Sequence, residues 1–389
     1  MLRNLRPLLF SILLCATSAA AQQPPAPRVV DLTAPDGLKL KATFFAAASP
    51  GPGMLLLHQC NRQRNVWDDL AARMASAGLN VMTLDLRGYG DSEGTRVDKL
   101  TPEEANVVFN EKIPRDIEVA YQFLIQQPGV SRASMAAGGA SCGVNQSVHL
   151  AMNHSEIKAL LFLSEITNSA GRSFLRAHPG MPLFLATAED DPDFGVSDLM
   201  QWIATFSTNA RTKFIRYKTG GHGVELFPAH PELPPKIVDW LTAALKSPGA
   251  ASAKASPYTS PVTTFFEALD QPNPNVSEIY ATYHSKNPQE IALLEVILNR
   301  LGYDHLQNKD NAGAIAVLKL NASIFPNSPN VYDSLGDAYL ADGQKDLARQ
   351  NAQKALELLA NDTNDPEDRR KNIRASAEQK LKQLSTTPN

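Results

Sequence analysis

Short apolar runs alternate with amphipathic helical patterns between residues 38 and 245, and this alternation is the feature that most limits the fold. The first run alternates apolar with polar residues, whereas the later runs are continuously apolar, as in strands buried on both faces of a sheet. The predicted strands are 38–44, 54–57, 79–84, 133–137, 159–163, 182–186 and 213–217. The clearest helical patterns between and after them are 66–77, 114–126, 143–153, 197–207 and 235–245. The pattern predicts an α/β fold, a mostly parallel sheet with helices on both faces.

The N-terminal residues have the layout of a secretory signal. Two arginines precede a short apolar stretch, and three consecutive alanines form a cleavage site before Gln22. The apolar stretch is too short to cross a bilayer. We therefore expect residues 1–21 to be removed and the mature chain to be secreted, into a bacterial periplasm, with no membrane span. Cys60 and Cys142 would then be the cysteines left, in an oxidising compartment.

A change in composition divides the mature chain. Residues 247–261 are rich in Pro, Ser, Ala and Gly and have no apolar periodicity, which indicates a linker. It separates a domain at 22–246 from an all-helical domain at 262–389. The whole chain carries 37 basic and 40 acidic residues, a net charge of −3. This balance argues against a nucleic-acid partner, because dedicated binders of nucleic acid show a basic excess.

A Gly-x-Ser-x-Gly sequence at residues 139–143 lies between a predicted strand and a predicted helix. In that setting it is typical of a nucleophile elbow, a strained turn that exposes its serine. The glycines are needed because strand and helix approach each other closely there. Ser141 is therefore the predicted nucleophile. Cys142 is a rival, but its frame would require glycines where Ala140 and Val144 stand.

A serine nucleophile needs a base and an acid that orients the base. His222 lies in a glycine-rich loop directly after the last predicted strand, and we expect it to be the base. The acid should follow the strand before that one. Asp191, directly before a proline, fits this place best, and Asp190 is the alternative acid. Glu189, and Glu165 after the preceding strand, are further candidates.

An oxyanion hole needs two backbone N–H donors. Cys142, the residue after the nucleophile, is one, and Gln59 or Cys60, in the turn after the strand 54–57, is the other. Two donors that point at one oxygen have Cα atoms within disulfide range. We therefore expect a disulfide between Cys60 and Cys142, with two unconnected thiols as the alternative. The chemistry requires no metal and no organic cofactor.

Residues 29–245 resemble the α/β-hydrolase family, nearest to its dienelactone-hydrolase-like and small serine esterase branch. The resemblance implies that the mostly parallel sheet of this α/β fold is eight-stranded. Besides the Ser, Asp and His pattern, residues 85–92 read Asp-Leu-Arg-Gly-Tyr-Gly-Asp-Ser, which is similar to a turn common after the fourth strand of that fold. Two features depart from the family: Gln59 stands where many relatives have glycine, and the acid turn 188–191 lacks the usual leading glycine.

The resemblance also bears on access to the site. Relatives with a lid domain usually carry it in the stretch that corresponds to residues 167–181, which is too short here to form one. The resemblance therefore implies an uncapped site that suits small or projecting esters, with residues 93–113 covering one rim.

The C-terminal part repeats itself with a period of 34 residues. Leu301-Gly302 recurs as Leu335-Gly336, and Ala314 recurs as Ala348. This period and these residue types resemble tetratricopeptide repeats. Helices near 277–299 and 368–384 would cap the two clear repeats. One interpretation is a groove for a protein or peptide partner, and the other is a stabilising or dimerising appendage.

Together these features predict a secreted, carboxylesterase-like serine hydrolase that acts on a small-molecule ester through an acyl-enzyme. Two alternatives remain at this stage. The first is a non-catalytic scaffold whose helical repeats bind a protein or peptide, and the second is a peptidase or amidase.

Overall fold

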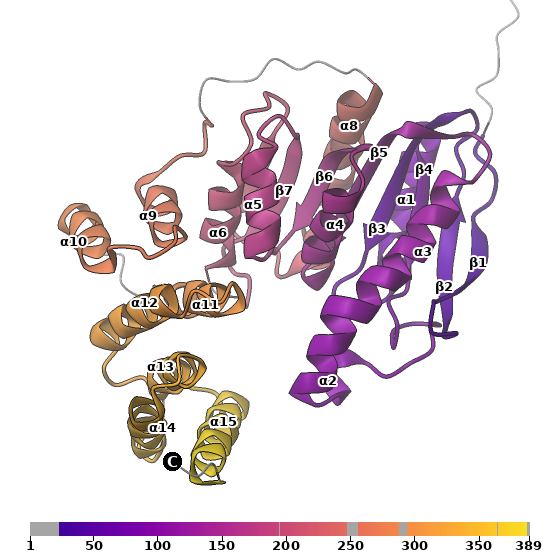
Figure 1. The fold of residues 1–389 in the computed structure, drawn as a ribbon. Coiled ribbons are helices and arrows are strands. Elements are labelled where there is room, and N and C mark those ends of the chain that lie inside the picture. Colours follow the sequence, from indigo (N-terminus) through magenta and orange to yellow (C-terminus); the bar gives the residue numbers. More distant parts are fainter. Residues whose placement is uncertain (1–22, 194, 247–255, 288–293, 364, 387–389) are drawn as a thin grey trace, which may run out of the picture.

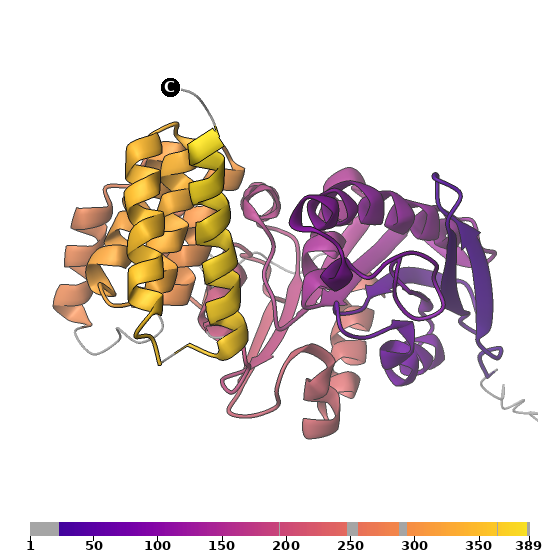
Figure 2. The same cartoon turned by 90° about the horizontal axis from the view of Figure 1, so that it is seen from below.

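The computed structural model describes residues 23–193, 195–246, 256–287, 294–363 and 365–386 (Figures 1 and 2). The predicted signal sequence and most of the predicted linker, residues 247–255, lie outside these ranges. Within the described ranges, no helix has both the length and the apolar character needed to cross a membrane.

An eight-stranded sheet forms the centre of the N-terminal part, which we call the α/β region. Its strand order is β1-β2-β4-β3-β5-β6-β7-β8. β2 runs antiparallel to β1 and β4, and the other neighbouring strands are parallel. The strands are β1 (Arg28–Thr33), β2 (Lys39–Phe45), β3 (Gly51–Leu57), β4 (Asn80–Leu84), β5 (Val130–Ala140), β6 (Ile157–Leu163), β7 (Leu183–Ala188) and β8 (Lys213–Tyr217). The prediction of a mostly parallel eight-stranded sheet is confirmed.

Helices cover both faces of this sheet, and each face has its own apolar core. One face carries α1 (Asp68–Ser76) and α8 (Leu233–Lys246). The other carries α3 (Ile113–Ile125), α4 (Cys142–Asn153), α5 (Ser169–Ala177) and α6 (Val196–Ala204). The central strands are buried on both sides, which explains their continuously apolar sequences.

Shorter helical segments lie in the connections. They are η1 (Arg64–Trp67), η2 (Val97–Lys99), α2 (Pro102–Val107), the π-helical turn η3 (Val108–Lys112), η4 (Gly223–Glu225) and α7 (Leu226–Ala229). α2 begins with a capping box, in which Thr101 and Glu104 each bond the other's backbone N–H. It continues through η3 into α3, so the part of the connection directly before α3 is helical.

The segment after the predicted linker is entirely helical, as expected, and we call it the C-terminal helical region. Its helices are α9 (Pro261–Leu269), α10 (Val276–Lys286), α11 (Leu294–Gln307), α12 (Asn311–Ile324), α13 (Pro329–Ala341), α14 (Lys345–Leu359) and α15 (Glu367–Thr386). The repeated Leu-Gly pairs lie on α11 and α13. A Cβ atom built on Gly302 would come within 2.5 Å of the Leu318 side chain, so α11 and α12 pack closely there. The assignment to tetratricopeptide repeats stays a prediction.

The C-terminal helical region packs against α5 and α6 of the α/β region, as Figures 1 and 2 both show. The apolar core on this face of the sheet continues from α6 into α9 and α11. Trp202 of α6 meets Phe266 of α9 edge-on, with ring centroids 6.0 Å apart. Buried Arg172 of α5 bonds two carboxylates of the helical region, Asp270 and Asp304. The two parts therefore share a core and an ionic contact, although the predicted linker lies between them in sequence.

Candidate active site

The turn between β5 and α4 holds Ser141 in a strained conformation. Its φ of 51° and ψ of −127° lie outside the regions that side-chain-bearing residues prefer. A Cβ atom on Gly139 would lie 2.2 Å from the carbonyl carbon of Gly143. One on Gly143 would lie 2.4 Å from the carbonyl oxygen of Leu57 at the end of β3. Both glycines are therefore required for β5, α4 and β3 to meet around Ser141.

The predicted base has a buried acid beside it. His222 lies in the loop after β8, and its Nδ1 is 2.9 and 3.0 Å from the two carboxylate oxygens of Asp191. The Asp191 side chain is 1 % exposed, and one of its oxygens also accepts a hydrogen bond from the backbone N–H of Asp193. With the Nδ1 proton donated to Asp191, the Nε2 atom of His222 is free to accept a proton.

The other candidate acids make different contacts. Asp190 accepts a hydrogen bond from the backbone N–H of Gly221. Glu189 forms an exposed ion pair with Lys218. Glu165 pairs with Arg300 of α11 at 2.7 Å. Among the four predicted candidates, Asp191 is thus the one that the structure brings against the imidazole.

The His222 loop packs against the serine turn. A Cβ atom built on Gly223 would be 3.4 Å from the Cβ of Ala140, the residue before Ser141. The same atom would be 2.3 Å from Gln59 Oε1, which accepts a hydrogen bond from the backbone N–H of Val224 at 3.0 Å. Gln59, the departure from the family pattern, therefore joins the turn after β3 to the His222 loop.

Charged neighbours control the protonation of His222. Burial alone would lower the pKa of its imidazole. The hydrogen bond and negative charge of Asp191 outweigh burial, with further contributions from Asp193 and Glu165, and the net effect raises the pKa. Asp193 is itself 3.7 Å from Nδ1, and burial raises the pKa of its carboxyl group. Asp193 was not predicted from the sequence, although its position two residues after Asp191 was a visible signal.

The residues predicted for the oxyanion hole lie on two adjacent turns. Cys142 is the first residue of α4, so its backbone N–H has no acceptor within the helix. A disulfide joins Cys142 to Cys60, with Cα atoms 5.9 Å apart. The bond fastens the turn after β3 to the first turn of α4, next to Ser141.

His58 at the end of β3 shapes the same turn from inside the protein. Its buried ring donates from Nδ1 to the carbonyl oxygen of Gln59 at 2.8 Å and accepts at Nε2 from the backbone N–H of Leu86 at 3.0 Å. Burial lowers the pKa of this imidazole, which favours the neutral form that both bonds require. His58 is therefore a structural support of the turn.

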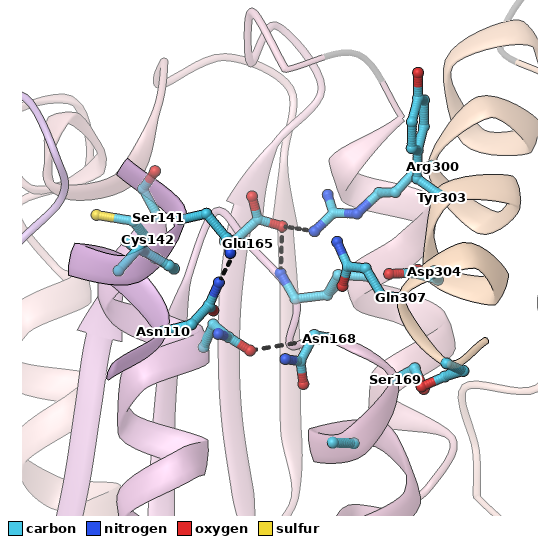
Figure 3. A pocket seen from close by; sticks show the side chains of 16 residues that line it. Asn110, Ser141, Cys142, Glu165, Asn168, Ser169, Arg300, Tyr303, Asp304 and Gln307 are labelled. Carbon is cyan, nitrogen blue, oxygen red and sulfur yellow. Dashed lines mark hydrogen bonds and ion pairs between the residues drawn. The ribbon is translucent and has the colours of Figure 1, made fainter. Parts of the chain in front are cut away.

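A cavity of about 810 Å³ opens beside Ser141 and Cys142. Its remaining lining residues come from four places: α2 and η3, α4, the segment from β6 into α5, and α11 with the residue after it (Figure 3). They are Asn106, Phe109, Asn110, Asn145, Glu165, Ile166, Asn168, Ser169, Ala170, Arg300, Tyr303, Asp304, Gln307 and Asn308. The expectation that residues 93–113 cover a rim agrees with the place of Asn106, Phe109 and Asn110.

The structure adds to the cavity a wall that the expectation of an uncapped site did not include. The stretch 167–181 forms only α5 and no lid, but α11 of the C-terminal helical region forms one wall of the cavity instead. No sequence pattern indicated that α11 would line the cavity, because α11 lies more than 100 residues beyond α5 in the chain. This wall exists because the C-terminal helical region packs against the α/β region.

One group of side chains in the described ranges places three possible metal ligands within 4.8 Å of one another: Asp191, Asp193 and His222. The same Asp191 and His222 atoms are joined by the hydrogen bond described above. An ion there would have to replace that bond, so the arrangement fits a base held by an acid better than a metal site.

Comparisons with known proteins place these features in context. No family model matches the chain. A thiohydrolase of Aspergillus aculeatus is 25 % identical over 144 residues, which are 37 % of this chain and 43 % of that protein. An uncharacterized protein of Mycobacterium tuberculosis is 30 % identical over 162 residues, 41 % of this chain and 52 % of its own length. The chain thus spans about half the length of the curated relatives it matches.

Solved structures with a similar fold include hydrolases. A dienelactone hydrolase from Anabaena variabilis has 17 % identity and a TM-score of 0.44, over 57 % of this chain and 99 % of that one. An esterase of Pyrococcus furiosus has 18 % identity and a TM-score of 0.42, over 57 % and 93 % of the two chains.

Three features agree on the fold: the strand order, the serine turn after β5, and the bonded acid and histidine that follow β7 and β8. The α/β region has the α/β-hydrolase fold. Within this hydrolase fold, the structure brings together the carboxyl ends of β3, β5, β7 and β8, the edge where such sheets carry their sites. The residues that the sequence analysis missed, Asp193 and the α11 residues, all lie at this same edge.

Proposed function

We propose that the chain is a secreted serine hydrolase that cleaves an ester-type bond through an acyl-enzyme. Ser141 is the nucleophile, His222 the base and Asp191 the acid that orients it. The backbone N–H groups of Cys142 and of Gln59 or Cys60 would hold the oxyanion. Secretion rests on the signal-like N-terminus, and the division at residues 247–261 into two domains rests on composition.

The reaction follows from these positions. Ser141 Oγ forms a bond to the carbonyl carbon while its proton passes to His222 Nε2. The oxyanion then collapses, the bond to the leaving alkoxide breaks, and His222 returns the proton to that oxygen. A water molecule, deprotonated by His222, attacks the acyl-enzyme in the same way and releases the acid. Asp191 stays ionised and stabilises the imidazolium in both steps.

One observation carries this proposal. His222, whose Nδ1 is bonded to Asp191, lies on a loop that packs against Ala140, the residue directly before a serine whose φ is positive. A structural ion pair would not require a strained serine beside it, and a glycine-rich turn would not require a buried acid and histidine. One curated relative is named a thiohydrolase, so thioesters belong beside oxygen esters in the substrate panel.

The test uses an active-site-directed fluorophosphonate on the purified chain, with turnover of short and long acyl esters and thioesters. We expect labelling and hydrolysis in the wild type and a loss of at least about a thousandfold in Ser141→Ala. Ser155→Ala, which removes an exposed serine in the loop after α4, is the matched control and should behave as the wild type. Labelling that persists in Ser141→Ala would refute the assignment of the nucleophile.

A further inference from the structure

The cavity beside Ser141 is unusually rich in amide side chains. Six of its sixteen lining residues are Asn or Gln: Asn106, Asn110, Asn145, Asn168, Gln307 and Asn308. Small-molecule sites are more often lined by apolar and aromatic side chains. Five of these amides use one of their two polar groups in a hydrogen bond within the described chain and keep the other, whereas Gln307 keeps both. Together they offer donors and acceptors, the combination that a hydroxyl group, itself a donor and an acceptor, can use.

The charged residues of the cavity are already paired. Glu165 and Arg300 bond each other at 2.7 Å across the gap between the two parts of the molecule, as Figure 3 shows. Asp304, one turn further along α11, is buried and bonds Arg172 at 3.0 Å. The cavity therefore offers hydrogen bonds without an unbalanced charge, and a neutral polar group fits it better than an anion, a cation or a long acyl chain.

These two ion pairs also hold α11 in place. Because Arg300 and Asp304 anchor successive turns of α11 to the α/β region, the side chains between and after them face the cavity from a fixed helix. Gln307 lies one turn after Tyr303 and projects from α11 into the cavity (Figure 3). Within the described chain its side chain makes no hydrogen bond to another residue, so its amide is available to a ligand.

We propose that this cavity binds the sugar moiety of an acylated carbohydrate, with Gln307 and Asn110 on opposite walls as specificity-determining residues. The size of the cavity suits a mono- or oligosaccharide that carries an acyl group to Ser141. The partly buried ring of Phe109 gives the rim beside Asn110 an apolar surface against which a sugar face can pack. The helical region thereby belongs to the substrate site.

A peptide fits the same walls less well. Extended peptides are commonly recognised by adding a strand to an exposed sheet edge. The lining residues lie on helices, on the π-helical turn and on loops, and none of them belongs to a strand. Recognition here would rest on side-chain amides, which favours a compact hydroxyl-rich ligand.

The proposal of a carbohydrate ester rests on the proposed hydrolase function, whereas the binding of the sugar does not. The experiment therefore has two readouts on the full chain. The first is kcat/KM for O-acetylated glucose and xylose relative to 4-nitrophenyl acetate, in the wild type, Gln307→Ala, Asn110→Ala and the control Gln353→Ala. Gln353 is an exposed glutamine on α14, outside the cavity. The second readout is saturation-transfer NMR of the free sugars with Ser141→Ala protein.

We expect each cavity variant to lower the ratio of sugar-ester to aryl-ester kcat/KM by about three- to tenfold, the effect of one lost hydrogen bond, and Gln353→Ala to leave it unchanged. Free sugars should give a transfer signal that weakens in Ser141→Ala/Gln307→Ala. Equal losses on both esters, no sugar signal, or a preference for acylated peptides would overturn the proposal. Turnover of aryl esters without a sugar signal would refute this inference alone, and a sugar signal without any turnover would refute the hydrolase function alone.

Discussion

Neighbouring acids in the turn after β7 lie in very different surroundings, and this predicts different roles. Asp191 is buried against His222, whereas Asp190, one residue earlier, is exposed and accepts a hydrogen bond from the backbone N–H of Gly221. We expect Asp191→Asn to lower kcat by about 10⁴-fold, because the amide no longer stabilises the imidazolium and favours the wrong tautomer. Asp190→Asn should keep activity within about tenfold of the wild type. Steady-state kinetics on one ester at saturating concentration measures both, and equal losses would contradict the assignment of Asp191.

The charge of Asp193 predicts a pH effect. The wild-type kcat/KM should rise with pH as His222 loses its proton, with its inflection above the ordinary histidine value of about 6.5, because the pKa of His222 is raised. Asp193→Asn removes a negative charge 3.7 Å from Nδ1 and so destabilises the imidazolium. The pKa should fall, and the inflection should move to lower pH.

The measurement for this prediction is a pH–rate profile of kcat/KM for the wild type and two variants. Asp239→Asn removes an exposed carboxylate on α8 and controls for the change in net charge. An inflection that stays in place in Asp193→Asn, or moves equally in both variants, would show that Asp193 does not act on His222.

At the scale of elements, a strand or turn could be predicted from the sequence wherever its own residues carry the pattern that forms it. Strands buried on both faces are continuously apolar, and the glycines around Ser141 mark the close approach of β5 and α4. β1 left no clear pattern, because it is an edge strand in which only Val30 and Leu32 are buried. α5 was missed because it has nine residues and a buried arginine within its apolar face.

The disulfide between the turn after β3 and α4 should stabilise the fold. It closes a loop with a sequence separation of 82 residues, which reduces the conformational freedom of the unfolded chain. We expect Cys60→Ser/Cys142→Ser to lower the free energy of unfolding by about 2–4 kcal/mol. Urea unfolding with and without reductant provides the control, since reductant should destabilise the wild type and leave the double variant unchanged. A count of two free thiols in denatured, unreduced wild-type protein would contradict the bond.

At the scale of the molecule, the sequence indicated two parts but not their contact. The bonds from Arg172 to Asp270 and Asp304 join residues 98 and 132 positions apart, and such pairs leave no periodic pattern in a sequence. The same holds for Glu165 and Arg300, which are 135 positions apart. The places of Ser141, Asp191 and His222 could be predicted from the ends of strands. The cavity wall depends on long-range packing, which strand and helix periodicity do not encode.

A substitution of Arg172 can test whether the α/β region and the C-terminal helical region unfold as one cooperative unit. The Arg172 side chain is fully buried, and Asp304, which it pairs with, is 10 % exposed. Arg172→Met would leave the Asp304 carboxylate without its ion-pair partner and would leave Asp270 paired with Arg176 alone. We expect a loss of about 3–5 kcal/mol in the free energy of unfolding, within a single urea transition. Arg73→Met, which breaks an exposed pair with Asp69 on α1, is the control and should change little.

The outcome also bears on the cavity, because Asp304 lies on α11. If Arg172 holds α11 in place, Arg172→Met should lower kcat/KM for the preferred ester more than Arg73→Met does, even under conditions where both variants remain folded. Two separate transitions, of which only the C-terminal one responds to Arg172→Met while turnover is unchanged, would mean that the helical region folds by itself and contributes nothing to the site. One shared transition with reduced turnover is the result that a continuous core and a shared cavity predict.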